Sequence, residues 1–151
     1  MKYRICKSFE VESGHMLMKH PGRCKFPHGH SRRIDIIVAS ETLDANDMVC
    51  DFKALKLAVA EAIDAYDHAM ALNSNDPLLP TLEKQAARLV VYKNEDPTTE
   101  VMARKIFELV KSKVGTTFVS KDGIRYALPA SLIIERVRVT ETSSSWAEYG
   151  V

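Results

Sequence analysis

Three histidines near the start of the chain have the spacing of a metal site. His28 and His30 lie two residues apart, directly before residues 31–39, which read as a β-strand. Side chains two apart on a strand point to the same face of the sheet, so both imidazoles can reach one ion. With His15 as a third nitrogen ligand, the set is typical of a catalytic zinc ion, which keeps one coordination position open for water or substrate.

Each of these histidines, taken alone, is better explained as a polar surface or capping residue. The chain has only 5 histidines, however, and four of them, including these three, fall within residues 15–30, so we favour the metal site. Cys24 lies in the same segment and is a candidate base beside the open position, because a thiolate is reactive near a cation. Taken alone it is equally well a small buried hydrophobic residue, as we expect for Cys6 and Cys50.

The composition predicts one soluble, cytoplasmic domain over residues 1–151. Apolar residues make up 46% of the chain and charged residues 27%, with a formal net charge of +1, a balance typical of globular proteins. Because so small a charge gives no overall field, we expect neither nucleic acid nor a membrane as a partner. Three cysteines argue against a secreted disulfide scaffold, and no signal peptide or bilayer-spanning apolar segment is found.

Apolar periodicity predicts the elements that must hold these side chains. Residues 2–13 alternate loosely and are predicted to form a first strand, followed by a loop over 14–29 and a second strand over 30–42. Asp51 is a suitable N-cap, and the apolar residues after it recur at helical spacing. An amphipathic helix is therefore predicted over 52–66.

A second helix is predicted to begin with Asp96 as the cap and Pro97 at the first helical position, and to end at Gly115. Residues 117–128 are predicted to form a hairpin and residues 132–142 a long strand. This order predicts an α+β fold, in which a four-stranded antiparallel ββααββ sheet carries two helices on one face. Such a small sheet leaves edges and a face that other copies of the chain are expected to cover.

Taken in order, the motifs resemble the 6-pyruvoyl-tetrahydropterin synthase superfamily, and most of all its bacterial 6-carboxytetrahydropterin synthase branch of queuosine biosynthesis. The resemblance covers most of the chain and rests on His15, Cys24 with His28-Gly29-His30, Val49–Lys56, Asp67-His68 with Leu72-Asn73, Pro97–Glu100, and Val139–Tyr149. Residues 74–96 depart from the family pattern as an insertion. Within it, residues 82–92 read as a short extra helix. The insertion either borders the pocket, which would bear on the exact substrate, or decorates its rim, which we favour.

The resemblance implies the tunnelling fold, in which three sheets close into a barrel, two trimers stack, and active sites lie between subunits. A homohexamer is therefore expected, with Zn²⁺ bound by the three histidines. Cys24, Asp67 and His68 would be the catalytic groups, with His68 oriented by a carboxylate such as Asp67. Without the resemblance, Asp67-His68 reads as a helix C-terminal pair.

Glu141 is the residue expected to hold the pterin, because a carboxylate can accept two parallel hydrogen bonds from an amino-pyrimidinone edge. Glu135, six residues earlier and expected on the same strand face, is its competitor. Thr98 and Thr99 are expected to add hydroxyl contacts, although helix capping explains them nearly as well. The basic residues nearest in sequence for the triphosphate are Lys19, Arg23 and Lys25.

The implied reaction converts 7,8-dihydroneopterin triphosphate into 6-carboxy-5,6,7,8-tetrahydropterin, acetaldehyde and triphosphate. The three residues between Cys24 and His28 resemble the carboxy-forming branch. The alternatives are a pyruvoyl-forming phosphate lyase or an aldolase-like variant of folate supply. A non-catalytic zinc-stabilised or pterin-binding module is less favoured, since mere binding needs neither Cys24 nor the Asp67-His68 pair.

Overall fold

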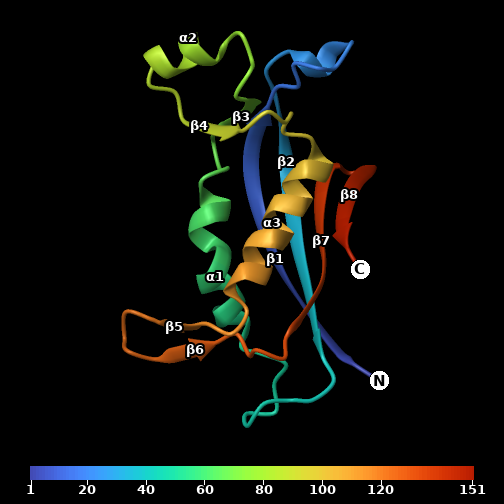
Figure 1. The fold of residues 1–151 in the computed structure, drawn as a ribbon, viewed down its shortest axis with the longest axis vertical. Helices are drawn as coiled ribbons and strands as arrows, with labels where there is room; N and C mark the ends of the chain where they lie inside the picture. Colours follow the sequence, from blue (N-terminus) through green and yellow to red (C-terminus); the bar gives the residue numbers. More distant parts are fainter.

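In the computed structural model, which describes residues 1–151, a six-stranded sheet carries two long helices on one face (Figure 1). The strands lie in the order β4-β3-β1-β2-β7-β8. Their bounds are β1 Tyr3–His15, β2 His28–Ser40, β3 Met70–Asn73, β4 Leu89–Tyr92, β7 Ile133–Thr142 and β8 Ser145–Gly150. The fold is α+β, as predicted, but the sheet is mixed, because β3 and β4 run parallel to their neighbours.

The long β1–β2 ladder positions the histidines. It pairs Tyr3 with Ser40 at one end and His15 with His28 at the other, without a bulge. Alternate residues face the helices, so Val11, Ile34 and Ile36 are buried in the core. Both strands extend two residues further toward their connection than predicted, so the loop covers only residues 16–27, with a short 3₁₀ turn at Arg23–Lys25.

Helix α1 (Phe52–Asp64) begins as predicted, since the Asp51 carboxylate accepts a hydrogen bond from the Lys53 backbone N–H. Helix α3 (Thr99–Lys113) is capped by the Thr98 hydroxyl, so the predicted cap at Asp96 is wrong. Gly115 follows α3 with a φ of 85°, a left-handed conformation that commonly ends a helix. Apolar side chains of both helices pack on the sheet, among them Leu55, Val59, Ile63, Met102, Ile106 and Val110.

The prediction of four antiparallel strands is wrong in two places. The predicted hairpin forms, as β5 (Thr117–Val119) and β6 (Arg125–Ala127), but it makes a separate two-stranded sheet. The main sheet instead gains β8 and the short parallel strands β3 and β4. Four-residue strands leave too little sequence for an apolar period to stand out.

The segment 74–96 differs from its predicted short helix over 82–92. Helix α2 spans Leu79–Lys84 and buries no residue, which agrees with an exposed position at one end of the molecule (Figure 1). The residues after it form β4, and Tyr92 at the end of β4 is only 2% exposed. The Tyr92 hydroxyl lies 2.6 Å from that of Tyr66, so part of this segment belongs to the interior.

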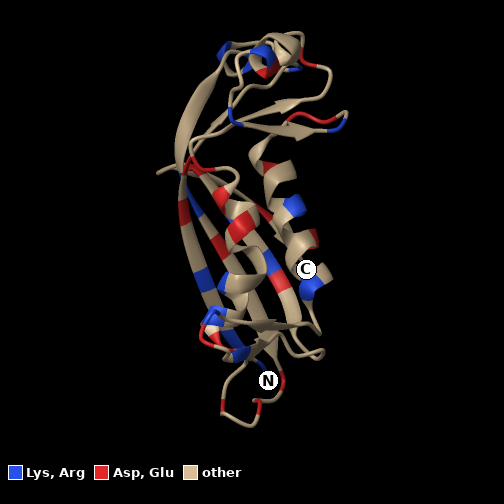
Figure 2. Ribbon diagram, turned by 90° about the vertical axis from the view of Figure 1, so that its left-hand side faces the viewer, with Lys and Arg blue, Asp and Glu red and all other residues tan.

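Two edges of the sheet remain largely unpaired. Along its outer edge β1 pairs with β3 only at Gly14 and His15, and β8 ends the sheet on the other side. Charged residues of both signs are spread over strands and helices, and no region gathers a single sign (Figure 2). None of the helices is long and apolar enough to span a bilayer.

Candidate active site

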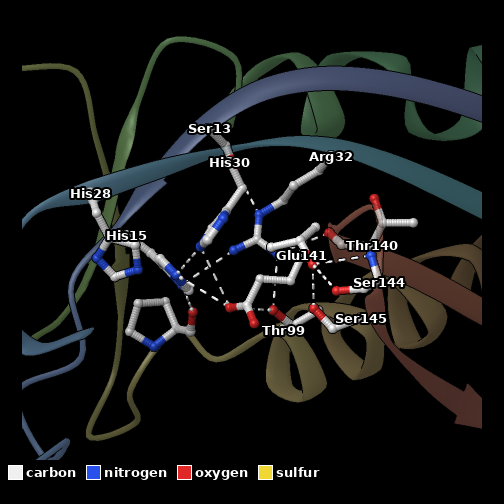
Figure 3. A network of polar contacts seen from close by, with 12 residues as sticks. Ser13, His15, His28, His30, Arg32, Thr99, Thr140, Glu141, Ser144 and Ser145 are labelled. Carbon is white, nitrogen blue, oxygen red and sulfur yellow. Dashed lines mark hydrogen bonds and ion pairs between the residues drawn. The ribbon is translucent and has the colours of Figure 1, made fainter. Parts of the chain in front are cut away.

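Three imidazoles converge where β1 ends and β2 begins (Figure 3). His15 and His28 are cross-strand partners, and His30 lies two residues further along β2 on the same face. The ring centroids lie 4.5 Å apart for His15 and His28, 5.0 Å for His15 and His30, and 5.1 Å for His28 and His30. One nitrogen from each ring lies within 4.8 Å of the others, so the predicted cluster forms.

Backbone carbonyls fix which nitrogen is free in the rings of His15 and His28. His15 Nδ1 lies 2.8 Å from the carbonyl oxygen of Pro97, and His28 Nδ1 lies 2.7 Å from that of Phe26. Because a carbonyl only accepts, each Nδ1 carries the hydrogen and each Nε2 presents a lone pair. This is the arrangement that orients metal-binding histidines.

The electrostatics favour the neutral form of His15 and His30. Burial lowers the pKa of His15 to about 4, with a further lowering by the nearby Arg32 charge. Burial likewise lowers the pKa of His30, again with Arg32 as an additional cause. Neutral imidazoles are the form that binds a metal ion.

The geometry fits a metal ion with three nitrogen ligands. Zn–N bonds of 2.0–2.1 Å in a tetrahedral site place neighbouring nitrogens about 3.4 Å apart. His15 Nε2 and His30 Nε2 are 3.1 Å apart, and all three ligand nitrogens lie within 4.8 Å of one another. His28 Nε2 is buried without any hydrogen-bond partner, which an ion at this point would supply. The triad could therefore hold a metal ion.

Glu141 lies directly beside the triad. Its Oε1 is 3.5 Å from His30 Nε2 and 3.6 Å from His15 Nε2, and it accepts a hydrogen bond of 3.2 Å from Thr99 Oγ1. A register shift between Thr140 and Thr142 marks the place where β7 delivers this side chain. The carboxylate and the imidazoles thus share one partly open site.

Glu135 lies elsewhere, and the prediction that it shares a face with Glu141 is wrong. A bulge in the β2–β7 pairing makes Glu135 an extra residue, so that Ile134 and Val137 face the core instead. Its carboxylate accepts a hydrogen bond of 2.6 Å from Arg4 Nε. Arg4 is 11 residues from His15 along β1, or about 36 Å at the usual rise of a strand.

The two threonines have different partners. The Thr98 hydroxyl accepts the Val101 backbone N–H and caps α3, which was the alternative interpretation for this residue. Thr99 is 5% exposed, and its hydroxyl lies between Arg32 and Glu141. Only Thr99 therefore belongs to the network around the triad.

Arg32 also belongs to this network, although the sequence analysis did not identify it as a site residue. It is 2% exposed and donates from Nε to Ser13 Oγ at 3.0 Å and from Nη1 to Thr99 Oγ1 at 2.9 Å (Figure 3). Nη1 also lies 3.2 Å from the Thr140 carbonyl oxygen. A signal was present, because Arg32 follows His30 by two residues and so occupies an inward position of β2.

Cys24 lies in the 3₁₀ turn of the loop between the two histidine-bearing strands. Its backbone carbonyl accepts a hydrogen bond of 3.0 Å from the Leu17 N–H, which folds the loop back toward the end of β1. The residue is partly buried, and its thiol makes no hydrogen bond to another side chain.

Asp67 and His68 form a separate pair on the outer edge of β1. Asp67 accepts the Glu12 N–H at 2.9 Å and lies 2.9 Å from His68 Nδ1. These hydrogen bonds, from the Glu12 backbone first and then from His68, lower the pKa of the Asp67 carboxyl. His68 has a φ of 55° and a side chain that is 77% exposed, with no contact to the triad of its own chain.

The basic residues predicted for the triphosphate do not join this network. Lys19 lines a cleft of about 480 Å³ together with His20, Glu95, Asp96 and Thr98, and its backbone N–H donates to Asp96 Oδ2 at 2.9 Å. The Lys25 ammonium lies over the Phe26 ring. Arg23 lies in the exposed part of the turn before Cys24.

Known proteins are similar to this chain over nearly its whole length. Residues 4–150 match the family profile of 6-pyruvoyl tetrahydropterin synthase. A 6-carboxy-5,6,7,8-tetrahydropterin synthase of Aquifex aeolicus is 29% identical, with 99% of this chain and 98% of that protein covered. The Haemophilus influenzae protein of the same name is 27% identical over 97% of this chain and 98% of its own length.

Solved structures show the same fold. An uncharacterised Wolinella succinogenes protein superposes with a TM-score of 0.77 at 23% identity, covering 99% of this chain and 98% of its own. Caenorhabditis elegans 6-pyruvoyl tetrahydropterin synthase gives a TM-score of 0.67 at 18% identity, covering 100% and 96%. With the profile match spanning nearly all residues, the chain belongs to the 6-pyruvoyl tetrahydropterin synthase family.

Proposed function

We propose that this protein is a zinc-dependent carbon–carbon lyase of the 6-carboxy-5,6,7,8-tetrahydropterin synthase type, acting on 7,8-dihydroneopterin triphosphate. The observation that carries the proposal is the position of Glu141 Oε1, 3.5 Å from His30 Nε2 and 3.6 Å from His15 Nε2. The metal site lies beside a carboxylate that can accept hydrogen bonds from the pterin ring. This arrangement suits a reaction on the side chain of a pterin. The names of the relatives support the carboxy-forming outcome.

The residues of the network have complementary tasks in this proposal. The Glu141 carboxylate accepts two parallel N–H groups of the amino-pyrimidinone ring, which fixes the pterin. The substrate's three-carbon side chain then lies over His15, His28 and His30. A zinc ion bound there supplies Lewis acidity, which stabilises negative charge on the side-chain oxygens.

Proton transfer is assigned to Cys24 and to the Asp67-His68 pair. Cys24, in the loop that follows His15, is assigned as the general base. His68, oriented by the Asp67 carboxylate, is assigned as the second acid–base group. We propose that His68 serves the site of a neighbouring subunit in a homohexamer built as a dimer of trimers. Its exposure and its position at Glu12, next to the part of β1 that has no strand partner on this side, support this arrangement.

The test is an identification of products. Purified, zinc-loaded protein is incubated with 7,8-dihydroneopterin triphosphate, and acetaldehyde is followed by NADH consumption in a coupled alcohol dehydrogenase reaction. We expect acetaldehyde to form with the wild type and to be absent with Cys24→Ala at equal zinc content. If the wild type releases triphosphate without acetaldehyde, the protein is a pyruvoyl-forming phosphate lyase; release of neither favours a binding module.

A further inference from the structure

The charge of Arg32 lacks a direct partner although it lies beside the active site. The residue is 2% exposed, and its guanidinium forms no ion pair with a carboxylate. A buried charge without a partner is unfavourable for folding, because water is lost and no opposite charge replaces it. By contrast, the neighbouring Arg33 points to the opposite face and pairs with Asp35.

The direction of the hydrogen bonds around Arg32 is fixed. A guanidinium only donates, so Thr99 Oγ1, at 2.9 Å from Arg32 Nη1, acts as the acceptor. The Thr99 hydroxyl hydrogen is then available to Glu141 Oε1 at 3.2 Å. The second contact of Nη1 is the carbonyl oxygen of Thr140, the residue before Glu141. Arg32 thereby supports the Glu141 side chain and the backbone that delivers it.

We propose that Arg32 is a positioning residue that orients the Glu141 carboxylate through Thr99. This inference rests on the proposed function, in which Glu141 holds the pterin. To accept two parallel N–H groups, both oxygens of the carboxylate must lie in the plane of the pterin ring. The hydrogen bond from Thr99 fixes one of these oxygens. A donor chain that begins on a permanent positive charge keeps this hydrogen bond directed at Glu141.

The alternative role for Arg32 is to orient His15, since Nη2 lies 3.2 Å from His15 Nδ1. The same Nδ1 lies 2.8 Å from the Pro97 carbonyl oxygen and donates its hydrogen there. In that tautomer Nδ1 has no lone pair to accept from Arg32, so Arg32 contributes nothing to holding the metal ligand. The two roles differ in what they predict for the retention of zinc.

The test compares neopterin binding with zinc content in a double-mutant cycle. The variants are Arg32→Met, Thr99→Val and the double variant, with Thr99→Ser to restore the hydroxyl and Arg33→Met as the matched control. Neopterin binding to the zinc-loaded proteins is measured by its fluorescence. We expect Arg32→Met and Thr99→Val each to weaken binding about tenfold, the factor expected for loss of a hydrogen bond to a charged group.

The double variant should bind about as weakly as either single variant, because both interrupt the same chain. Thr99→Ser and Arg33→Met should bind like the wild type, and zinc content should be unchanged throughout. Wild-type affinity in Arg32→Met or Thr99→Val, additive losses, or loss of zinc from Arg32→Met would each overturn the inference. If Arg32→Met fails to fold, Thr99→Val decides, since it preserves shape. A wild type that does not bind neopterin would instead overturn the proposed function.

Discussion

Replacing Glu141 by glutamine tests pterin recognition with the smallest change of shape. The carboxylate accepts at both oxygens, whereas the amide accepts at one position and donates at the other. One ring N–H of the pterin would then face an N–H of the new amide instead of an acceptor. An unsatisfied buried polar group of this kind costs about 1–3 kcal/mol, or roughly 5- to 150-fold in the dissociation constant.

The assay is titration of neopterin into the zinc-loaded proteins, with zinc content measured in parallel. Glu135→Gln is the matched control, because Glu135 lies on the same strand but bonds to Arg4 instead of the site. We expect Glu141→Gln to keep its zinc and to bind neopterin weakly, and Glu135→Gln to bind like the wild type. The reverse ranking would refute the assignment of the pterin acceptor.

Three further outcomes are expected. The double variant His28→Ala/His30→Ala should lose zinc binding and turnover together. Full zinc occupancy in this variant would contradict the assignment of the three histidines as zinc ligands. Cys24→Ala should keep zinc and neopterin binding but lose turnover, because a methyl group accepts no proton; near-normal turnover would make Cys24 a packing residue. Asp67 has a lowered pKa in the folded protein, so its stabilising effect is present above the unfolded pKa and is lost as the pH falls through the folded value. The difference in unfolding free energy between wild type and Asp67→Asn should therefore shrink on acidification from pH 7, and a pH-independent difference would contradict this.

The cluster of three histidines was predictable because its geometry is local. A spacing of two residues places His28 and His30 on one face of any strand, and the loop of residues 16–27 folds back so that His15 lies opposite His28. The caps of the helices are also local, but Asp96, Pro97 and Thr98 offer competing starts within three residues. The structure uses Thr98, while Asp96 accepts hydrogen bonds from the Lys19 N–H and the Asn73 amide.

The features that were not predicted correctly depend on residues that are distant in sequence. Alternation alone puts Glu135 and Glu141 on one face, and only the pairing of β7 with β2 reveals the bulge that separates them. The role of Arg32 depends on Thr99, which lies 67 residues away in sequence. β4 likewise exists because it pairs with β3, which in turn extends the end of β1.

The most direct test of the central claim is the molar ratio of acetaldehyde to triphosphate released from 7,8-dihydroneopterin triphosphate. Cleavage of the side chain after elimination predicts a ratio of one, with 6-carboxy-5,6,7,8-tetrahydropterin as the remaining product. Omission of zinc should abolish both products in the metal-free protein. A ratio of zero, with triphosphate released and all side-chain carbons kept on the pterin, would contradict the carbon–carbon lyase assignment.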